Sequence, residues 1–204
     1  MSSANDYLAL PFQKFLDDTA ARTPSPGGGS VSASVGALAA ALARMAIEYT
    51  AGNKKYVAHE ERLQQLREEL RRAQEMFGQL MREDMAAYER YAAARKSGDA
   101  QELERAIATA VAVPMEIVVL AGAVTARLDE IKAFTNPRLY GDLQAAAVLA
   151  HSAAMAAATS VRSNLHELAN PKEATRLEDK LDLLLTRSGR HRNAVLHHEP
   201  AAVP

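Results

Sequence analysis

A run of residues spaced alternately three and four apart constrains the fold of this chain more than any other feature. It extends from Leu63 to Tyr91, and every member except one is apolar or aromatic. Only a long α-helix places residues with this spacing on one face. The 204 residues include 42 Ala, but only 4 Phe, 6 Tyr and no Trp. Such small side chains favour closely packed helices over a β-sandwich, which needs β-branched and aromatic residues. The sequence therefore predicts an all-α helical bundle.

Glycines, prolines and capping residues divide the chain into a series of helices. We expect these helices at about 8–21, 30–51, 53–96, 99–134, 142–170 and 171–189. Pro114 should kink or split the fourth of them, because proline lacks the N–H that a helix interior needs. No strand or internal repeat is evident, so we expect a single domain over residues 1–190. Residues 191–204, which include two prolines, are expected to form a loose tail.

Charge and cysteine content limit the partners of the chain. Lys and Arg total 24 against 25 Asp and Glu, a near balance that argues against binding of duplex nucleic acid. The absence of Cys excludes disulfides, thiolate zinc sites and cysteine nucleophiles. Three histidines near the C-terminus, His191, His197 and His198, lack acidic partners at ligand spacing, so we expect no metal site. The apolar stretches fall short of a bilayer span, which predicts a soluble, cytoplasmic protein with no membrane partner.

Asp84 is the one charged member of the long apolar run. A carboxylate on a buried helix face costs desolvation energy unless it is paired, and its pKa is free to rise. Tyr88 follows four residues later on the same side of the helix and is within reach of a shared site. In an alternative interpretation, the buried face is shifted onto Met81, Met85 and Tyr88, which leaves Asp84 at the rim.

Three consecutive glycines, Gly27, Gly28 and Gly29, come directly before Ser30 at the start of the second expected helix. Glycines allow close approach of the backbone, and a helix N-terminus offers free N–H groups to an anion. The same segment is also compatible with a flexible connector. Its spacing matches neither a dinucleotide-binding loop nor a P-loop, so those functions receive no support.

Other candidate residues lie near expected helix ends. Lys54 and Lys55 fall in a first helical turn, where the helix dipole disfavours cations, so they either bind an anion or are simply exposed. Asp142 stands where a helix needs an N-cap, and capping is the plain alternative to a role in a site. Arg162 and Asn164 lie near the end of the same helix, where Arg complements the helix C-terminus.

Taken together, these segments resemble the cyclodeaminase/cyclohydrolase family of folate enzymes over roughly residues 10–170. The resemblance implies a helical bundle that forms a homodimer and holds folate in a groove. Two segments depart from the family pattern, because Asn53 replaces a lysine and the residues around Asn136 match only in part. The matching segments are Thr23–Ser30, Thr50–Tyr56, Glu83–Asp84 with Ala87–Tyr88, Val113–Met115, Asn136 with Gly141–Asp142, and Ser160–Leu165.

The resemblance implies one of two reactions at the one-carbon group between N5 and N10 of tetrahydrofolate. Either 5,10-methenyltetrahydrofolate is hydrolysed to 10-formyltetrahydrofolate, or 5-formiminotetrahydrofolate is cyclised with release of ammonia. Both need a proton-transfer group and negative charge near a cationic centre, roles that would fall to Asp84 and Asp142. The folate is the substrate, and no cofactor is implied. A non-catalytic binding or assembly protein on the same scaffold is the alternative.

The resemblance also implies how the folate would be held. Lys54, Lys55 and Arg162 would bind its glutamate carboxylates, aided by the glycine loop. Asp142 and Arg162 are 20 residues apart, which is ~30 Å along a straight helix, so they cannot serve one end of one ligand within one subunit. A two-fold homodimer would bring opposite helix ends together. The other substrate-binding residues implied are Gly27, Gly28, Gly29, Ser30, Tyr88, Asn136 and Asn164.

Overall fold

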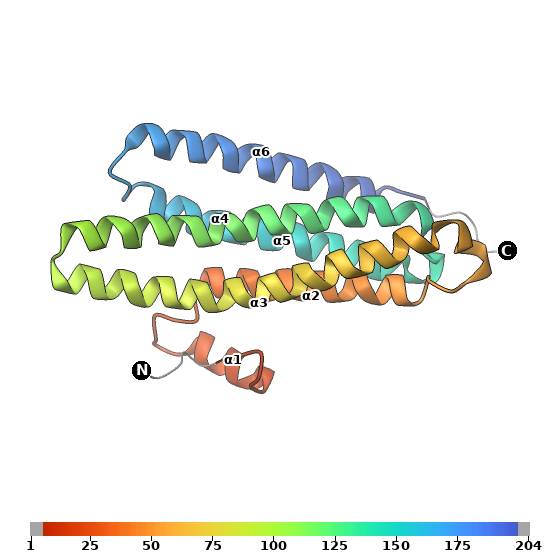
Figure 1. Cartoon of the computed structure of the whole chain (residues 1–204), viewed down its shortest axis with the longest axis horizontal. Coiled ribbons are helices and arrows are strands. Elements are labelled where there is room, and N and C mark those ends of the chain that lie inside the picture. Colours follow the sequence, from red (N-terminus) through yellow and green to blue (C-terminus); the bar gives the residue numbers. More distant parts are fainter. Residues whose placement is uncertain (1–5, 200–204) are drawn as a thin grey trace.

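The computed structural model describes residues 6–199 as long antiparallel helices (Figure 1). This part of the chain contains no β-strand, so the all-α expectation is confirmed. The elements in chain order are α1 Phe12–Ala20, α2 Gly28–Glu48, the 3-10 helix η1 Lys54–His59, α3 Glu60–Ser97, α4 Ala100–Ile131, the 3-10 turns η2 Lys132–Phe134 and η3 Pro137–Leu139, α5 Tyr140–Leu165 and α6 Pro171–Leu196.

Four of these helices, α2 to α5, form a closed ring around the main core. α2 packs against α3 and α5, and α4 packs against the same two helices from the other side. α6 lies along the groove between α4 and α5, whereas α1 lies outside the ring (Figure 1). α2 comes close to its neighbours because its buried residues are small: a Cβ on Gly36 would lie 2.4 Å from the Phe77 ring of α3. These small residues let α2 pack closely against α3 and α5 as part of the ring around the core.

The capping residues act largely as the sequence indicates. The Asp99 carboxylate accepts the backbone N–H of Gln101 at 2.9 Å and starts α4, while Gly98, with φ of 76°, ends α3. Asn53 also caps a helix, but this is η1, so the long helix α3 starts only at Glu60. Pro114 does not split its helix, since α4 is continuous from Ala100 to Ile131.

The C-terminal helix is longer than the sequence indicated. α6 continues to Leu196, so the expectation of a loose tail from residue 191 is wrong for 191–196, while 200–204 lie outside the described residues. Val195 is fully buried, and its carbonyl accepts the Tyr140 hydroxyl at 2.5 Å. Gly189 does not end the helix, because it lies inside α6 where a Cβ would be 3.5 Å from the His151 ring.

Two helical segments are long and apolar enough to cross a membrane by length and composition alone: Gly28–Glu48 and Ala100–Phe134. The expectation that the apolar stretches are too short to span a bilayer is therefore wrong for these two helices, by length and composition. Half of each apolar window is buried inside the bundle, and core helices of soluble proteins also pass this test. The two helices are weak evidence for a membrane partner.

Candidate functional site

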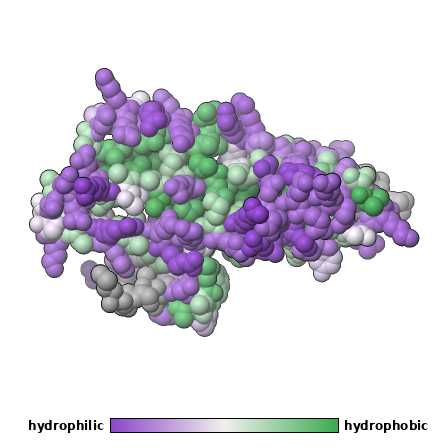
Figure 2. All heavy atoms as spheres, in the orientation of Figure 1, coloured by the Kyte–Doolittle hydropathy of each residue, from purple (hydrophilic) through white to green (hydrophobic). Residues whose placement is uncertain are grey.

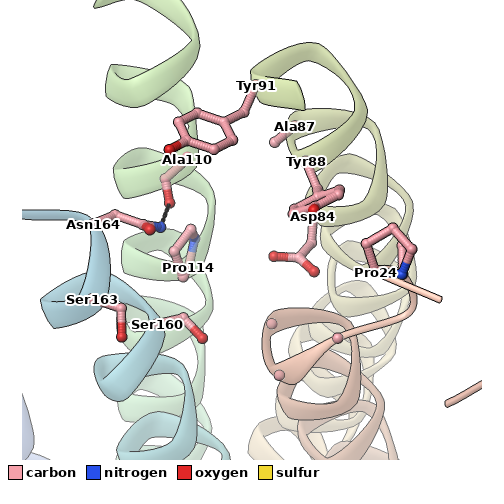
Figure 3. A pocket seen from close by; sticks show the side chains of 14 residues that line it. Pro24, Asp84, Ala87, Tyr88, Tyr91, Ala110, Pro114, Ser160, Ser163 and Asn164 are labelled. Carbon is pink, nitrogen blue, oxygen red and sulfur yellow. Dashed lines mark hydrogen bonds between the residues drawn. The ribbon is translucent and has the colours of Figure 1, made fainter. Parts of the chain in front are cut away.

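A cavity of about 280 Å³ opens where the start of α2 meets α3, α4 and the end of α5 (Figure 3). α2 contributes the three glycines and α3 contributes Asp84, Tyr88 and Tyr91. On the opposite wall lie Pro114 of α4 and Ser160, Ser163 and Asn164 of α5. Segments that are far apart in the sequence, including the glycine loop and the segment around Asp84, therefore share one cavity.

Asp84 is half-buried and its carboxylate points into this cavity (Figure 3). The Ser30 hydroxyl donates to Asp84 Oδ2 at 2.7 Å, and the Ser30 backbone N–H also bonds the carboxylate. Burial raises the pKa of Asp84 above its ordinary value, and the two bonds from Ser30 oppose this rise. Met81 and Met85 are buried as well, whereas Tyr88 is 42% exposed, so the alternative interpretation is correct for the two methionines and wrong for Tyr88.

The glycine loop brings the first turn of α2 directly against this carboxylate. A Cβ on Gly29 would lie 1.9 Å from Asp84 Oδ1, so no other residue fits there without displacing Asp84. The positive end of the α2 dipole thus faces a carboxylate of the chain itself. This geometry indicates that the glycines let the backbone of α2 lie against the Asp84 carboxylate, and it does not favour a flexible connector. It does not favour the loop as a binding site for glutamate carboxylates of the substrate, since Asp84 already occupies that position.

Asn164 lines the cavity and also completes the backbone hydrogen bonding of α4. Pro114 has no N–H, so the Ala110 carbonyl four residues earlier lacks its usual helical partner. Asn164 Nδ2 donates to this carbonyl at 2.8 Å (Figure 3). The proline gives a local signal that one carbonyl is unpaired. No local pattern indicates that the missing donor comes from α5.

Sequence reasoning missed a polar cluster around Tyr91, one of the residues that line the cavity. The Tyr91 hydroxyl donates to Glu167 Oε2 at 2.8 Å and joins α3 to the loop after α5. Arg95 bonds both partners, with its Nε 2.9 Å from the Tyr91 hydroxyl oxygen and its Nη2 2.9 Å from Glu167 Oε2. Tyr91 and Arg95 share a helix face, but nothing in the sequence pairs them with Glu167, 72 residues beyond Arg95.

A second group of expected site residues lies at the other end of the bundle. Lys54 and Lys55 belong to η1, beyond the C-terminus of α2, whose 21 residues span ~30 Å. Asn136 lies at the same end, because its backbone N–H donates to Thr50 Oγ1 at 3.1 Å. Asp142 is in the first turn of α5, close in sequence to Asn136. Within one protomer these four residues therefore cannot reach the cavity.

Arg162 does not line the cavity, although it lies close in sequence to residues that do. Its Nε donates to Glu178 at 2.7 Å and its Nη2 to Asp182 at 2.6 Å, so it ties α5 to α6. The geometry therefore gives no support to Arg162 as a ligand for a substrate carboxylate. Among residues 6–199, no group of three or more His, Asp and Glu could hold a metal ion.

Comparisons with known proteins agree with this architecture. The formiminotransferase-cyclodeaminase family profile matches residues 11–183. Methenyltetrahydrofolate cyclohydrolase of Methylorubrum extorquens is 27% identical over 186 residues, which cover 87% of this chain and 89% of that protein. Formimidoyltransferase-cyclodeaminase of Sus scrofa is 26% identical over 187 residues, and this chain spans only 35% of it. A crystal structure of formiminotetrahydrofolate cyclodeaminase from Thermotoga maritima matches with a TM-score of 0.89 and 29% identity, covering 93% of this chain and 95% of that one. The chain belongs to the formiminotransferase-cyclodeaminase family.

Proposed function

We propose that this protein is a folate one-carbon enzyme, which either hydrolyses 5,10-methenyltetrahydrofolate or cyclises 5-formiminotetrahydrofolate with release of ammonia. The observation that carries the proposal is Asp84, the one charged side chain among the described residues that line the 280 Å³ cavity. The reacting carbon of both substrates bears or develops positive charge, which a single half-buried carboxylate stabilises. The names of the relatives support the same substrate class.

Asp84 would transfer the proton in either reaction. In the hydrolysis, water adds to the methenyl carbon and loses a proton. The hydroxyl of this adduct then loses its proton as the C=O bond forms and the carbon–N5 bond breaks, and N5 gains one, so one proton is released overall. In the cyclisation, N10 adds to the formimino carbon and loses a proton, and the imino nitrogen gains two protons and leaves as ammonia, which forms the methenyl cation. A carboxyl whose pKa is raised by burial is better suited than an ordinary aspartate both to take up a proton and to give it back at neutral pH. Ser30 holds the carboxylate in place.

Two assays on the purified protein test this proposal. One follows loss of 5,10-methenyltetrahydrofolate, and the other follows ammonia released from 5-formiminotetrahydrofolate. Turnover in one assay supports the proposal and separates the two activities. If neither substrate reacts, the non-catalytic binding or assembly alternative replaces the enzyme. As part of the proposal, the protein is cytoplasmic and needs no cofactor besides its tetrahydrofolate substrate.

The proposed active form is a homodimer that pairs through the α2–α5 face. This face consists of the outward residues Val31, Val35, Leu38 and Leu42 of α2 with Ala145, Val148, Ser152, Met155 and Thr159 of α5. All of them are uncharged and at least partly exposed. α6 covers the α4–α5 side of the ring, and α1 packs near α3 and borders this face at Leu38, which lines a cavity together with α1 residues. Uncharged surface on two neighbouring helices is unusual for a monomer and favours a protein interface.

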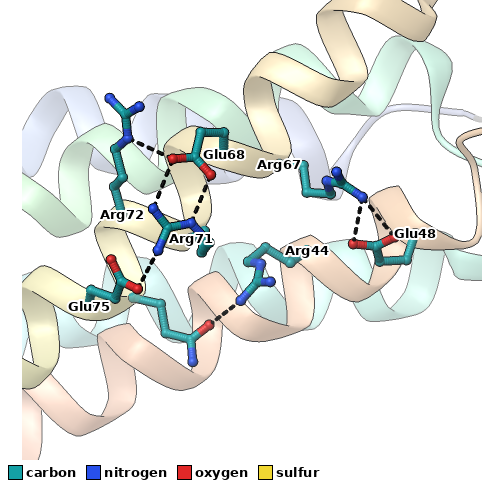
Figure 4. A network of polar contacts seen from close by, with 8 residues as sticks. Arg44, Glu48, Arg67, Glu68, Arg71, Arg72 and Glu75 are labelled. Carbon is teal, nitrogen blue, oxygen red and sulfur yellow. Dashed lines mark hydrogen bonds and ion pairs between the residues drawn. The ribbon is translucent and has the colours of Figure 1, made fainter.

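The side of the bundle where α2 meets α3 is strongly charged and contrasts with the α2–α5 face. Where α2 meets α3, Arg67 bonds Glu48 at 3.4 Å, and Arg71 and Arg72 bind Glu68, whose pKa they lower to about 2 (Figure 4). On the side shown in Figure 2, polar side chains gather over the N-terminal half of α3. These sides are therefore less suited to bury against a second copy.

The proposed dimer would also complete the site. α2 and α5 are antiparallel, since Gly28 lies beside Ser160 at one end and Thr50 beside Asn136 at the other. A two-fold axis across the α2–α5 face places the cavity end of one copy against the opposite end of the other. That opposite end carries Lys54, Lys55, Asn136 and Asp142. The residues in segments that resemble the family form two groups, which lie ~30 Å apart within one protomer. The proposed dimer would bring these two groups together.

Introducing a charge on this face should separate the protomers. Met155→Glu places a carboxylate where the partner would bury it unpaired, so we expect the dimer dissociation constant to rise on the order of 100-fold. Sedimentation velocity at several concentrations measures this change. Met76→Glu is the matched control, because Met76 is 51% exposed on α3 and Met155 is 53% exposed on α5. A wild-type monomer at micromolar concentration, or an unaffected Met155→Glu dimer, would contradict the proposed interface.

A further inference from the structure

Four residues of α3 form a stripe that leads from the proposed reaction centre along the cavity and one helical turn beyond its last lining residue: Asp84, Tyr88, Tyr91 and Arg95. Their spacing of four, three and four keeps them on one helix face. At 1.5 Å per residue, Tyr88, Tyr91 and Arg95 lie about 6, 10 and 16 Å beyond Asp84 along the axis. The first three line the cavity. The stripe thus presents a carboxylate, two aromatic rings and a guanidinium in fixed order.

The guanidinium of Arg95 is held beside Tyr91, a residue that lines the cavity. It lies 5.4 Å from the centre of the Tyr91 ring, which places it back towards Asp84, the direction in which helical side chains lean. Its Nε and Nη2 bond the Tyr91 hydroxyl and Glu167. In the described part of the chain its third nitrogen, Nη1, makes no hydrogen bond, and the side chain is 57% exposed. Arg95 is therefore positioned and still has donors available to a ligand.

The order of groups along this stripe matches the order of groups in a reduced folate, and this step rests on the proposed function. A folate that places its one-carbon group at Asp84 continues with the aminobenzoyl ring and ends in glutamate carboxylates. Tyr88 and Tyr91 offer flat apolar surface for the ring. A guanidinium binds a carboxylate through strong, charge-assisted hydrogen bonds. We infer that Arg95, held in place by Tyr91 and Glu167, binds the first glutamate of the folate and determines the preference for glutamylated substrates.

The other candidate cations of the same protomer lie elsewhere. Arg162 bonds Glu178 and Asp182 of α6, neither of which lines the cavity, and Lys54 and Lys55 are at the far end of α2. Arg90 lines a different cavity on another face of α3, together with Arg105. In the proposed dimer the two lysines come from the second copy and would meet the folate from outside, whereas Arg95 bonds Tyr91, which lines the cavity of its own protomer.

A pair of substrates with and without the glutamate tests this inference. The proposed substrate and its pteroyl analogue, which ends at the benzoate, are compared on wild type and Arg95→Ala. We expect Arg95→Ala to raise KM for the glutamyl substrate on the order of 10- to 100-fold, with kcat within about twofold and KM for the analogue unchanged. Arg95→Lys should recover part of the loss, since it keeps the charge without the planar fork.

Two further variants separate binding from a structural effect. Arg90→Ala removes an exposed arginine of the same helix and should leave both KM values unchanged. Tyr91→Phe keeps the ring but loses the hydroxyl that positions Arg95, so KM should rise several-fold for the glutamyl substrate alone. The inference would be overturned if Arg95→Ala raised KM equally for the two substrates, or raised it for neither.

Equilibrium binding distinguishes this inference from the proposed function. The probes are 5-formyltetrahydrofolate, which is stable in solution, and its pteroyl counterpart. If wild type shows no turnover but Arg95→Ala weakens only the glutamyl probe, the inference stands and the proposed reaction fails. If turnover is normal and wild type binds both probes equally, the reaction stands and the inference fails. Absence of binding to both probes would overturn both.

Discussion

Asp84→Asn is expected to lower kcat for the folate substrate by a factor of about 10² to 10⁴, the usual contribution of a positioned acid–base group. The amide has nearly the same volume as the carboxyl and can still accept the Ser30 hydroxyl, so the cavity keeps its shape. It cannot take up the proton of the attacking water or N10. The assay is steady-state turnover of whichever folate the wild type uses. Near-normal kcat in Asp84→Asn would show that this carboxylate is structural, and Asp142 would become the leading candidate.

The same variant should be more stable than wild type at neutral pH. Burial is the main cause of the raised pKa of Asp84, so the ionised form is less favourable in the folded than in the unfolded chain. The contribution of Asp84 to stability is therefore fully present below its unfolded pKa and is lost as pH rises through the raised, folded pKa. Denaturation by urea should show a higher free energy of unfolding for Asp84→Asn than for wild type at pH 7, and a smaller difference between the two in acid. A loss of stability at pH 7 would mean that the bonds from Ser30 outweigh desolvation.

Gly29→Ala is the second substitution with a large expected effect. The added Cβ would lie 1.9 Å from Asp84 Oδ1, so either the carboxylate or the first turn of α2 must move. We expect a loss of turnover similar to that of Asp84→Asn, together with a loss of about 1–3 kcal/mol in the free energy of unfolding from overpacking. Turnover and urea denaturation measure the two effects separately.

Gly122→Ala is the matched control. Gly122 lies inside α4, and a Cβ there meets nothing within 4 Å. Alanine is the better helix former, so this variant should gain roughly 0.5–1 kcal/mol of stability and keep full turnover. Normal activity in Gly29→Ala would show that the close approach of the glycine loop to Asp84 is not needed for the reaction.

The sequence predicted those features of the fold that depend on local spacing. The three-and-four pattern from Leu63 to Tyr91 places Asp84 on the inner face of α3, because a helix repeats every 3.6 residues wherever it packs. The rise per residue likewise predicted that Asp142 and Arg162 lie far apart on one helix. Both predictions used only the geometry of a single element.

The features that the sequence did not predict are contacts between distant elements. Asn164 completes the hydrogen bonding of Ala110, and Glu167 holds Tyr91 and Arg95, but no periodicity links these positions. Glycine is typical of a helix end, and yet Gly189 lies inside α6, where a Cβ would make only an ordinary contact with His151 of α5. Arg162 suits an anion site by charge alone, and only the fold shows that α6 supplies its acidic partners.

The pH dependence of kcat/KM in wild type and Ser30→Ala tests the central claim, that Asp84 is the proton-transfer group, most directly. The Ser30 hydroxyl stabilises the ionised carboxylate and so holds the pKa of Asp84 below the value that burial alone would give. If Asp84 acts as the base, the acidic limb of the profile should move to higher pH in Ser30→Ala. A lower kcat/KM with an unshifted limb would contradict the claim, since the ionisation that controls the rate would then belong to another group.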